Sequence, residues 1–213
     1  MKLRFLVLCL AFALMNLAAL AQDNPSTVSA STASYTGVGP TDVGLYVNPV
    51  GIRITNSQAD TGPFAFLGDN TTVRTFYGAD IGGYVNFYHA RSYDAGIDIR
   101  DAIVSGNGAH LNSFLVSARV IAKPLAESFK PYLQLSIGAA TSKAPTSTVH
   151  LTRAQYGLFG GLDYTLAKHV DFRVFELGYG AASTINSGNF NGAVTFPASR
   201  LFSVSTGLVF RIP

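Results

Sequence analysis

The stretch that decides the fold is the C-terminal sequence LFSVSTGLVFRIP, residues 201–213. Its side chains alternate in character from one residue to the next. One set is mostly large and apolar: Phe202, Val204, Thr206, Leu208, Phe210 and Ile212. The set between them is small or polar: Ser203, Ser205, Gly207 and Arg211. Because successive side chains of a β-strand point to opposite faces, the pattern predicts a strand with one apolar and one polar face.

The same alternation returns in RAQYGLFGGLDY, residues 153–164. The apolar set is Ala154, Tyr156, Leu158, Leu162 and Tyr164. The opposite set is Arg153, Gln155, Gly157, Gly161 and Asp163. A shift of one residue in the strand pairing would exchange the two faces, so the register of this strand is well specified.

Applied to the rest of the chain, this template predicts eight strands, at 43–56, 74–89, 94–105, 111–123, 130–142, 149–167, 170–183 and 199–212. Each has about ten or more residues, the length that a tilted strand needs to cross a membrane. The pattern therefore indicates an all-β protein, an eight-stranded antiparallel up-and-down transmembrane β-barrel.

Two of these strands alternate less cleanly. A proline interrupts the first strand, and a bulge near residues 48–49 would return Ile52 and Ile54 to the apolar face. In the seventh strand two phases compete for the apolar face. A bulge between Val174 and Phe175 would reconcile them.

The links between strands alternate in length. Short links are predicted at 91–93, 125–127 and 168–169, and longer ones at 57–73, 106–110, 143–148 and 184–198. Short periplasmic turns and longer external loops are typical of membrane barrels. The first long link contains an apolar cluster, Pro63–Leu67. We expect it to fold over the barrel mouth rather than to contact a partner, because exposed apolar clusters tend to be covered.

The N-terminal residues predict a cleaved secretory signal peptide, residues 1–21. Basic residues precede an apolar stretch, which ends in an A-x-A site at Ala19-Leu20-Ala21. A single membrane anchor is the alternative. Residues 22–41 are rich in Ser, Thr, Gly and Pro and predict a flexible N-terminal segment. The barrel then occupies residues 42–213.

The composition is unusual for a soluble domain. Only 13% of the residues are charged while 48% are apolar, which suggests that much of the exterior meets lipid. The single cysteine, Cys9, lies in the signal peptide, so no disulfide is expected in the mature chain. Loss of Lys2 and Arg4 leaves 15 − 2 = 13 basic residues against 12 acidic ones. Such a balance gives no reason to expect nucleic-acid binding.

A soluble carrier such as a lipocalin is the competing architecture, with its apolar faces turned inward. Glycines on the polar faces favour a narrow polar interior instead: Gly78, Gly82, Gly157, Gly161 and Gly207. Aromatic residues on the apolar faces also gather near the strand ends. The predicted girdles are Tyr77, Tyr156 and Phe202 towards the long loops, and Phe87, Tyr164, Phe172 and Phe210 towards the short turns.

Over about residues 42–213 the chain resembles the small bacterial outer-membrane β-barrels of the OmpA-like transmembrane-domain family. The resemblance lies in diffuse segments: FYGADIGGYVNFYHARSYDAGIDIR, KPYLQLSIGAA, YGLFGGLDYTLAKHVDFRVFELGYG and FSVSTGLVFRIP. It implies a porin-like protein of the Gram-negative cell envelope. The partners it implies are outer-membrane lipid, lipopolysaccharide and the barrel-insertion machinery. The family's peptidoglycan-binding domain has no counterpart in these segments, so wall anchoring is not expected.

The polar faces carry charged and hydrogen-bonding residues that we expect to meet inside the barrel. The predicted interior network comprises Asp80, Tyr84, Asn86, Asp98, Arg100, Arg119, Tyr132, Gln134, Arg153, Asp163, Arg173 and Glu176. Unpaired buried charges are costly, so these groups are expected to pair. An eight-stranded barrel is narrow enough to be filled by side chains, which favours a plug over a gated ion path.

Some eight-stranded outer-membrane barrels resemble lipid A deacylases or palmitoyltransferases, which use histidine near the outer rim. His110 with Ser113, or His150 with Thr152, could lie there, but neither pair has a carboxylate in sequence reach. His89 and His169 fall at the turn end. We therefore predict no catalytic residues, and no metal-ligand or cofactor motif is present.

These observations predict a non-enzymatic barrel that contributes to envelope integrity or presents its loops to external partners. A small-solute or ion pore is the first alternative, and an outer-leaflet lipid enzyme the second.

Overall fold

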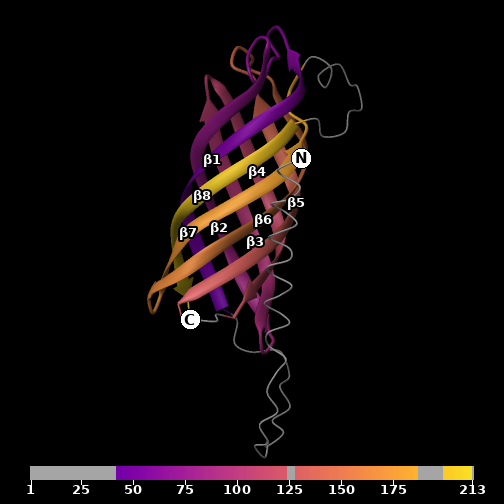
Figure 1. The fold of residues 1–213 in the computed structure, drawn as a ribbon. Coiled ribbons are helices and arrows are strands. Elements are labelled where there is room, and N and C mark those ends of the chain that lie inside the picture. Colours follow the sequence, from indigo (N-terminus) through magenta and orange to yellow (C-terminus); the bar gives the residue numbers. More distant parts are fainter. Residues whose placement is uncertain (1–41, 124–127, 187–198, 213) are drawn as a thin grey trace, which may run out of the picture. The chain divides into compact units, whose positions relative to one another are not determined.

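The computed structural model describes residues 42–123, 128–186 and 199–212. Eight strands make up the fold: β1 (Asp42–Asp60), β2 (Thr71–His89), β3 (Tyr93–Gly106), β4 (Ala109–Ala122), β5 (Phe129–Lys143), β6 (His150–Ala167), β7 (Val170–Ala182) and β8 (Ser199–Ile212). Each strand pairs antiparallel with the next, and β1 also pairs with β8, which closes the barrel (Figure 1). The predicted fold class is confirmed.

The two ends of the barrel differ. β1 begins and β8 ends at one end, where Val43 pairs with Ile212; we call it the turn end. The other end carries residues 61–70 between β1 and β2, and we call it the loop end. β1 and β2 are longer than predicted, so the link expected over 57–73 shrinks to 61–70.

Side chains alternate between the interior and the exterior, most regularly along β4. Every second residue from Ala109 to Ile121 is buried, and those between are exposed. The exposed positions of the barrel hold large apolar side chains such as Ile99, Leu135 and Phe210, each at least 48% exposed. The apolar faces therefore point outward, as the pattern in residues 201–212 predicts.

The predicted bulge in β1 is wrong. Pairing with β2 runs without a shift from Asp42 to Thr55. Ile52 and Ile54 consequently point inward, where they are 5% and 0% exposed. The reason is that the interior is apolar at this height, so inward isoleucines need no change of face. Pro49 lies on the outward face of this regular strand.

The predicted bulge in β7 is confirmed. The register against β8 shifts between Arg173 and Glu176, so Val174 and Phe175 both point outward. Arg173 and Glu176 can then both point inward, and both are buried. One extra residue thus supplies the interior with two charges of opposite sign from the same strand.

Several predictions fall outside the described residues: the signal peptide over 1–21, the flexible segment over 22–41, the short link at 125–127 and most of the link at 184–198. In the described part of the chain, no helix has the length and apolar character needed to cross a membrane.

Candidate functional site

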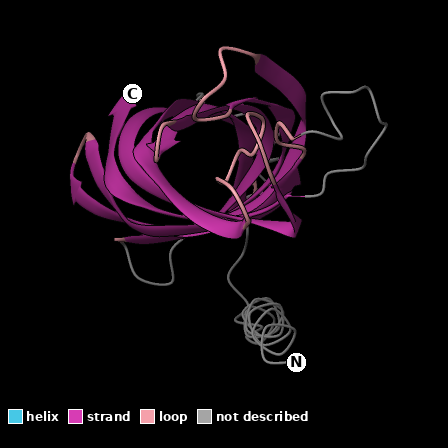
Figure 2. Cartoon of the chain, turned by 90° about the horizontal axis from the view of Figure 1, so that it is seen from above, coloured by secondary structure: helices cyan, strands magenta, loops and turns pink. Residues whose placement is uncertain are grey.

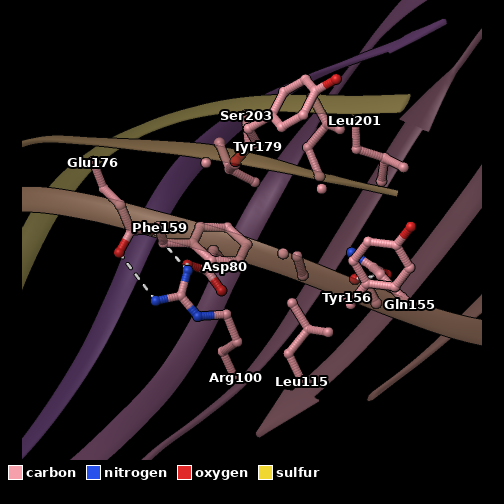
Figure 3. Close-up of a pocket in the computed structure, with 17 residues that line it drawn as sticks. Asp80, Arg100, Leu115, Gln155, Tyr156, Phe159, Glu176, Tyr179, Leu201 and Ser203 are labelled. Carbon is pink, nitrogen blue, oxygen red and sulfur yellow. Dashed lines mark hydrogen bonds and ion pairs between the residues drawn. The ribbon is translucent and has the colours of Figure 1, made fainter. Parts of the chain in front are cut away.

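The barrel interior is the candidate site, and Arg100 on β3 lies at its centre. Its guanidinium donates two hydrogen bonds to the carboxylate of Glu176 on β7, at 2.7 and 3.0 Å. It also donates to Asp98 at 3.2 Å, to Asp80 at 3.4 Å and to the side-chain oxygen of Gln134. Figure 3 shows the pairing with Glu176 and Asp80. A single buried arginine therefore joins side chains from four strands.

Two further buried arginines share the carboxylate of Asp163 on β6. Arg119 donates to it at 3.1 Å and Arg173 at 3.0 Å. Arg173 also lies 3.5 Å from Glu176, which connects the two halves of the network. Tyr132 donates a hydrogen bond of 2.7 Å to the same glutamate. The network therefore crosses the lumen from β3 to β7.

Aromatic rings flank each guanidinium. Arg119 lies between Tyr84 and Tyr132, 4.0 and 4.2 Å from the ring centroids. Arg173 lies 4.5 Å from the ring of Tyr46, and Arg100 lies 4.5 Å from that of Phe159. Cation–π attraction stabilises the planar guanidinium in a site with little water. Rings and charges together fill the cross-section of the barrel.

The interior charges do not cancel. Three buried arginines face four buried carboxylates, those of Asp80, Asp98, Asp163 and Glu176. Among the described residues, Asp80 has the weakest pairing, because its only ion pair there is the 3.4 Å contact with Arg100 and its second oxygen lacks a hydrogen-bond partner. It borders a cavity of about 30 Å³, together with residues shown in Figure 3. Such a volume suits a water molecule, not a solute.

An apolar layer closes the interior towards the loop end. Its buried members include Val50, Ile52, Ile54, Val104, Leu111 and Leu201. The 61–70 loop folds into this layer: Phe66 is fully buried and stacks on Phe76 at 5.1 Å. Thr146, in the loop between β5 and β6, donates to the carbonyl of Pro63 at 3.3 Å. Loops reach across the barrel mouth in Figure 2, and the expected lid over 63–67 is confirmed.

The Phe66→Ala variant is expected to loosen this lid. Removing a buried phenylalanine costs about 3 kcal/mol, from lost burial and the cavity left behind. We expect a lower midpoint for unfolding by urea, measured from the fast-migrating folded band of unboiled protein on a denaturing gel. We also expect faster proteolysis within residues 61–70. The exposed Gln58, changed to alanine, is the control and should alter stability by less than about 0.5 kcal/mol. Unchanged proteolysis in the Phe66 variant would contradict the lid.

A separate charge cluster lies at the turn end. Asp171 is buried and accepts from Lys130 at 3.0 Å, and it forms an ion pair of 3.0 Å with Arg211. Nearby, Asp94 lies 2.9 Å from His89 and 3.4 Å from Lys123. Lys123, Lys130 and Arg211 at this end are therefore paired with carboxylates of the barrel itself.

The structure places most of the predicted interior residues in the buried lumen: Asp80, Tyr84, Asn86, Asp98, Arg100, Arg119, Tyr132, Gln134, Asp163, Arg173 and Glu176. The exception is Arg153, whose placement in the lumen is wrong, because it is exposed near the loop end of β6. The reason is depth. The lumen at that height is filled by the apolar layer, so a long charged side chain there extends to solvent.

Sequence reasoning missed Tyr46 and the Lys130–Asp171 pair. Tyr46 donates to Asp98 at 3.0 Å and is 1% exposed. Its inward direction follows from the simple alternation of β1, since Leu45 and Val47 are exposed on either side. The assumed bulge obscured that signal.

The histidine pairs weighed as catalytic do not assemble. Ser113 points inward and donates to Gln155, whereas His110 is exposed on the opposite face of β4. Thr152 is engaged with Thr141 at 2.8 Å, and His150 is exposed. Across the described residues, no group of three or more His, Cys, Asp or Glu side chains could hold a metal ion.

The predicted aromatic girdles lie at the two ends of the outer surface. Six of the residues are exposed: Tyr77, Tyr156 and Phe202 near the loop end, and Phe87, Phe172 and Phe210 near the turn end. Tyr164 is half-buried because its ring packs on Phe129, 5.0 Å away. The girdles frame the band of exposed aliphatic side chains.

One acidic side chain interrupts this apolar surface. Asp101 lies on the outward face between Ile81 and Phe114 and accepts a 3.4 Å hydrogen bond from Asn112. It lies in the half of β3 nearer the loop end, with Ile103 and Ser105 beyond it on the same face. The cost of a lipid-facing charge falls towards the membrane interface, which makes this position tolerable.

No protein-family model matches the chain, and a search of curated proteins gives no match. Solved structures do match. Neisserial surface protein A is 15% identical with a TM-score of 0.53, covering 83% of this chain and 99% of its own. Ail, the attachment invasion locus protein of Yersinia pestis, is 8% identical with a TM-score of 0.52, covering 80% and 98%.

The chain has the fold of a small outer-membrane β-barrel. At these identities the likeness concerns the fold alone. It confirms the architecture that the resemblance to OmpA-like barrels implied.

Proposed function

We propose that this protein is a non-enzymatic outer-membrane β-barrel with a side-chain-filled lumen, exported through a cleaved signal peptide. One observation carries the proposal. The buried side chains of the barrel include three arginines and four carboxylates in one network, while its exposed positions hold large apolar residues. A water-soluble barrel needs the reverse distribution, because exposed apolar surface on this scale would drive aggregation.

The filled lumen supports a structural or surface role over transport. The polar network, the apolar layer and the 61–70 loop succeed one another along the barrel axis. The cavity of about 30 Å³ in the network is far smaller than a solute path. The molecule then contributes to envelope integrity or contacts partners through its external loops. The separation of His110 from Ser113 supports a non-enzymatic role.

The folded protein is expected to give no steady conductance in planar bilayers, because paired charges and apolar side chains occlude its interior. It should also migrate faster unboiled than boiled on a denaturing gel, as a closed barrel resists the detergent. A Ser113→Phe variant, which fills the cavity beside Ser113, serves as the control. Steady channels in the wild type that this variant abolishes would establish the pore alternative.

A further inference from the structure

We propose that Arg53 on β1 and Arg200 on β8 form a binding site for the phosphate groups of a glycolipid headgroup, as carried by lipopolysaccharide in the outer leaflet. The site lies on the outside of the barrel, at the loop end. This inference rests on the proposed membrane location. It adds the residues of this chain that bind the phosphate groups of such a lipid.

The two arginines are neighbours across the β1–β8 seam. Arg53 pairs with Phe202 and Thr55 pairs with Arg200, so the two arginines stand diagonally opposite each other. Diagonal neighbours in a sheet lie about 7–8 Å apart, within reach of one ligand for side chains of this length. Both are exposed. Two guanidinium groups therefore project from one small area of the outer wall.

Neither guanidinium is neutralised by the barrel. Arg53 and Arg200 have no ion pair or side-chain hydrogen bond within residues 42–123, 128–186 and 199–212. The turn end differs, since Lys130 and Arg211 both contact Asp171. Arg53 and Arg200 are therefore adjacent positive charges that no described carboxylate pairs, and arginine binds phosphate oxygens in a bidentate manner.

Aromatic side chains lie beside the two arginines and on their membrane side. Tyr179 pairs with Phe202, the residue opposite Arg53, and both rings point outward. Tyr77 is 70% exposed, and its ring crosses β1 at Gly51, two residues from Arg53 on the same face. A Cβ atom at Gly51 would meet this ring at 3.4 Å, an ordinary contact distance, so the ring lies over the strand at this position.

The order of side chains along the wall matches the order of groups in a phosphorylated glycolipid. Along β8 the outward residues run from Arg200 through Phe202 to Val204. In the paired strands, Arg53 and Tyr179 lie in the row of Phe202, and Tyr77 and Leu177 lie in the row of Val204. Phosphate suits the first level and acyl chains suit the last. Amphipathic aromatic rings suit the boundary in between, where the sugar of such a lipid lies.

The test uses the mature protein refolded in detergent micelles, with bisphosphorylated lipid A as the probe and native mass spectrometry as the readout. The double variant Arg53→Gln/Arg200→Gln is expected to lower the affinity at least about tenfold, since it removes two charge-assisted contacts. Dephosphorylated lipid A should bind the wild type as weakly as lipid A binds the variant. Phosphatidylglycerol should bind wild type and variant alike.

The matched control is Arg91→Gln/Lys168→Gln, which removes two exposed charges in turns at the other end of the barrel. Its affinity for lipid A should equal that of the wild type. The site would be overturned if the Arg53/Arg200 variant bound lipid A as tightly as the wild type, or if the wild type bound dephosphorylated lipid A as tightly as lipid A. Displacement of lipid A by inorganic phosphate alone would also overturn it. The faster migration of unboiled protein is checked first, and its absence would instead overturn the membrane barrel.

Discussion

Replacing Arg100 with methionine is expected to lower the free energy of unfolding by about 3–5 kcal/mol, as removal of one partner from a buried ion pair does. The variant keeps the volume of the side chain but leaves Glu176, Asp98 and Asp80 buried without their shared cation. The cost arises from the remaining carboxylates, which water cannot reach. Urea titration of the folded band in lipid vesicles measures it.

A second substitution separates charge from packing. Adding Glu176→Gln to Arg100→Met removes the carboxylate with the shortest contact to Arg100, 2.7 Å. The double variant should therefore lose less stability than the sum of the losses in the two single variants. Arg91→Met, at an exposed turn position, should change stability by less than about 0.5 kcal/mol. A loss below about 1 kcal/mol for Arg100→Met would show that the interior is wet and its charges are solvated.

The Gly78→Ala variant is expected to fail to form the heat-resistant folded band. Gly78 lies on β2 opposite Val104 of β3, and a Cβ atom there would overlap the carbonyl oxygen of Ile103. That atom belongs to the backbone, so no side-chain rotation can relieve the overlap. The β2–β3 pairing would have to separate, at a cost of about 3 kcal/mol or more.

The control for this variant is Gly160→Ala on β6. A Cβ atom there would meet Leu133 at 3.5 Å and the carbonyl of Tyr132 at 3.7 Å, both ordinary contacts. Neither glycine has a positive φ, so the two substitutions differ in space and not in backbone strain. Folding of Gly78→Ala with normal yield and urea midpoint would show that the strands can separate locally at little cost.

The inward side chains of β7 are predictable from the sequence. Two charged residues three positions apart cannot share a face of a regular strand, so Arg173 and Glu176 required a bulge between them. The structure has that bulge. The bulge is predictable because both residues and the flanking Phe172 and Leu177 belong to a single strand, where alternation is a local property.

β1 shows where the same reasoning failed. The apolar character of Ile52 and Ile54 predicts the lipid face for both, and a bulge would be needed to bring them there. In the structure they face inward and pack beside Phe66 and Phe76. Polarity marks the inward face only where the lumen is polar. At the height of the apolar layer, both faces of the strand carry apolar side chains and the signal disappears.

By itself the sequence determined the strands, their number, their antiparallel order and the side from which most charges project, because side-chain alternation is decided residue by residue. Only the tertiary structure decided the layering inside: the polar network, the apolar layer above it, the insertion of the 61–70 loop and the exposure of Arg153. Depth along the barrel depends on strand tilt and on pairing between distant segments, such as β1 with β8. Neither is a property of any single stretch of chain.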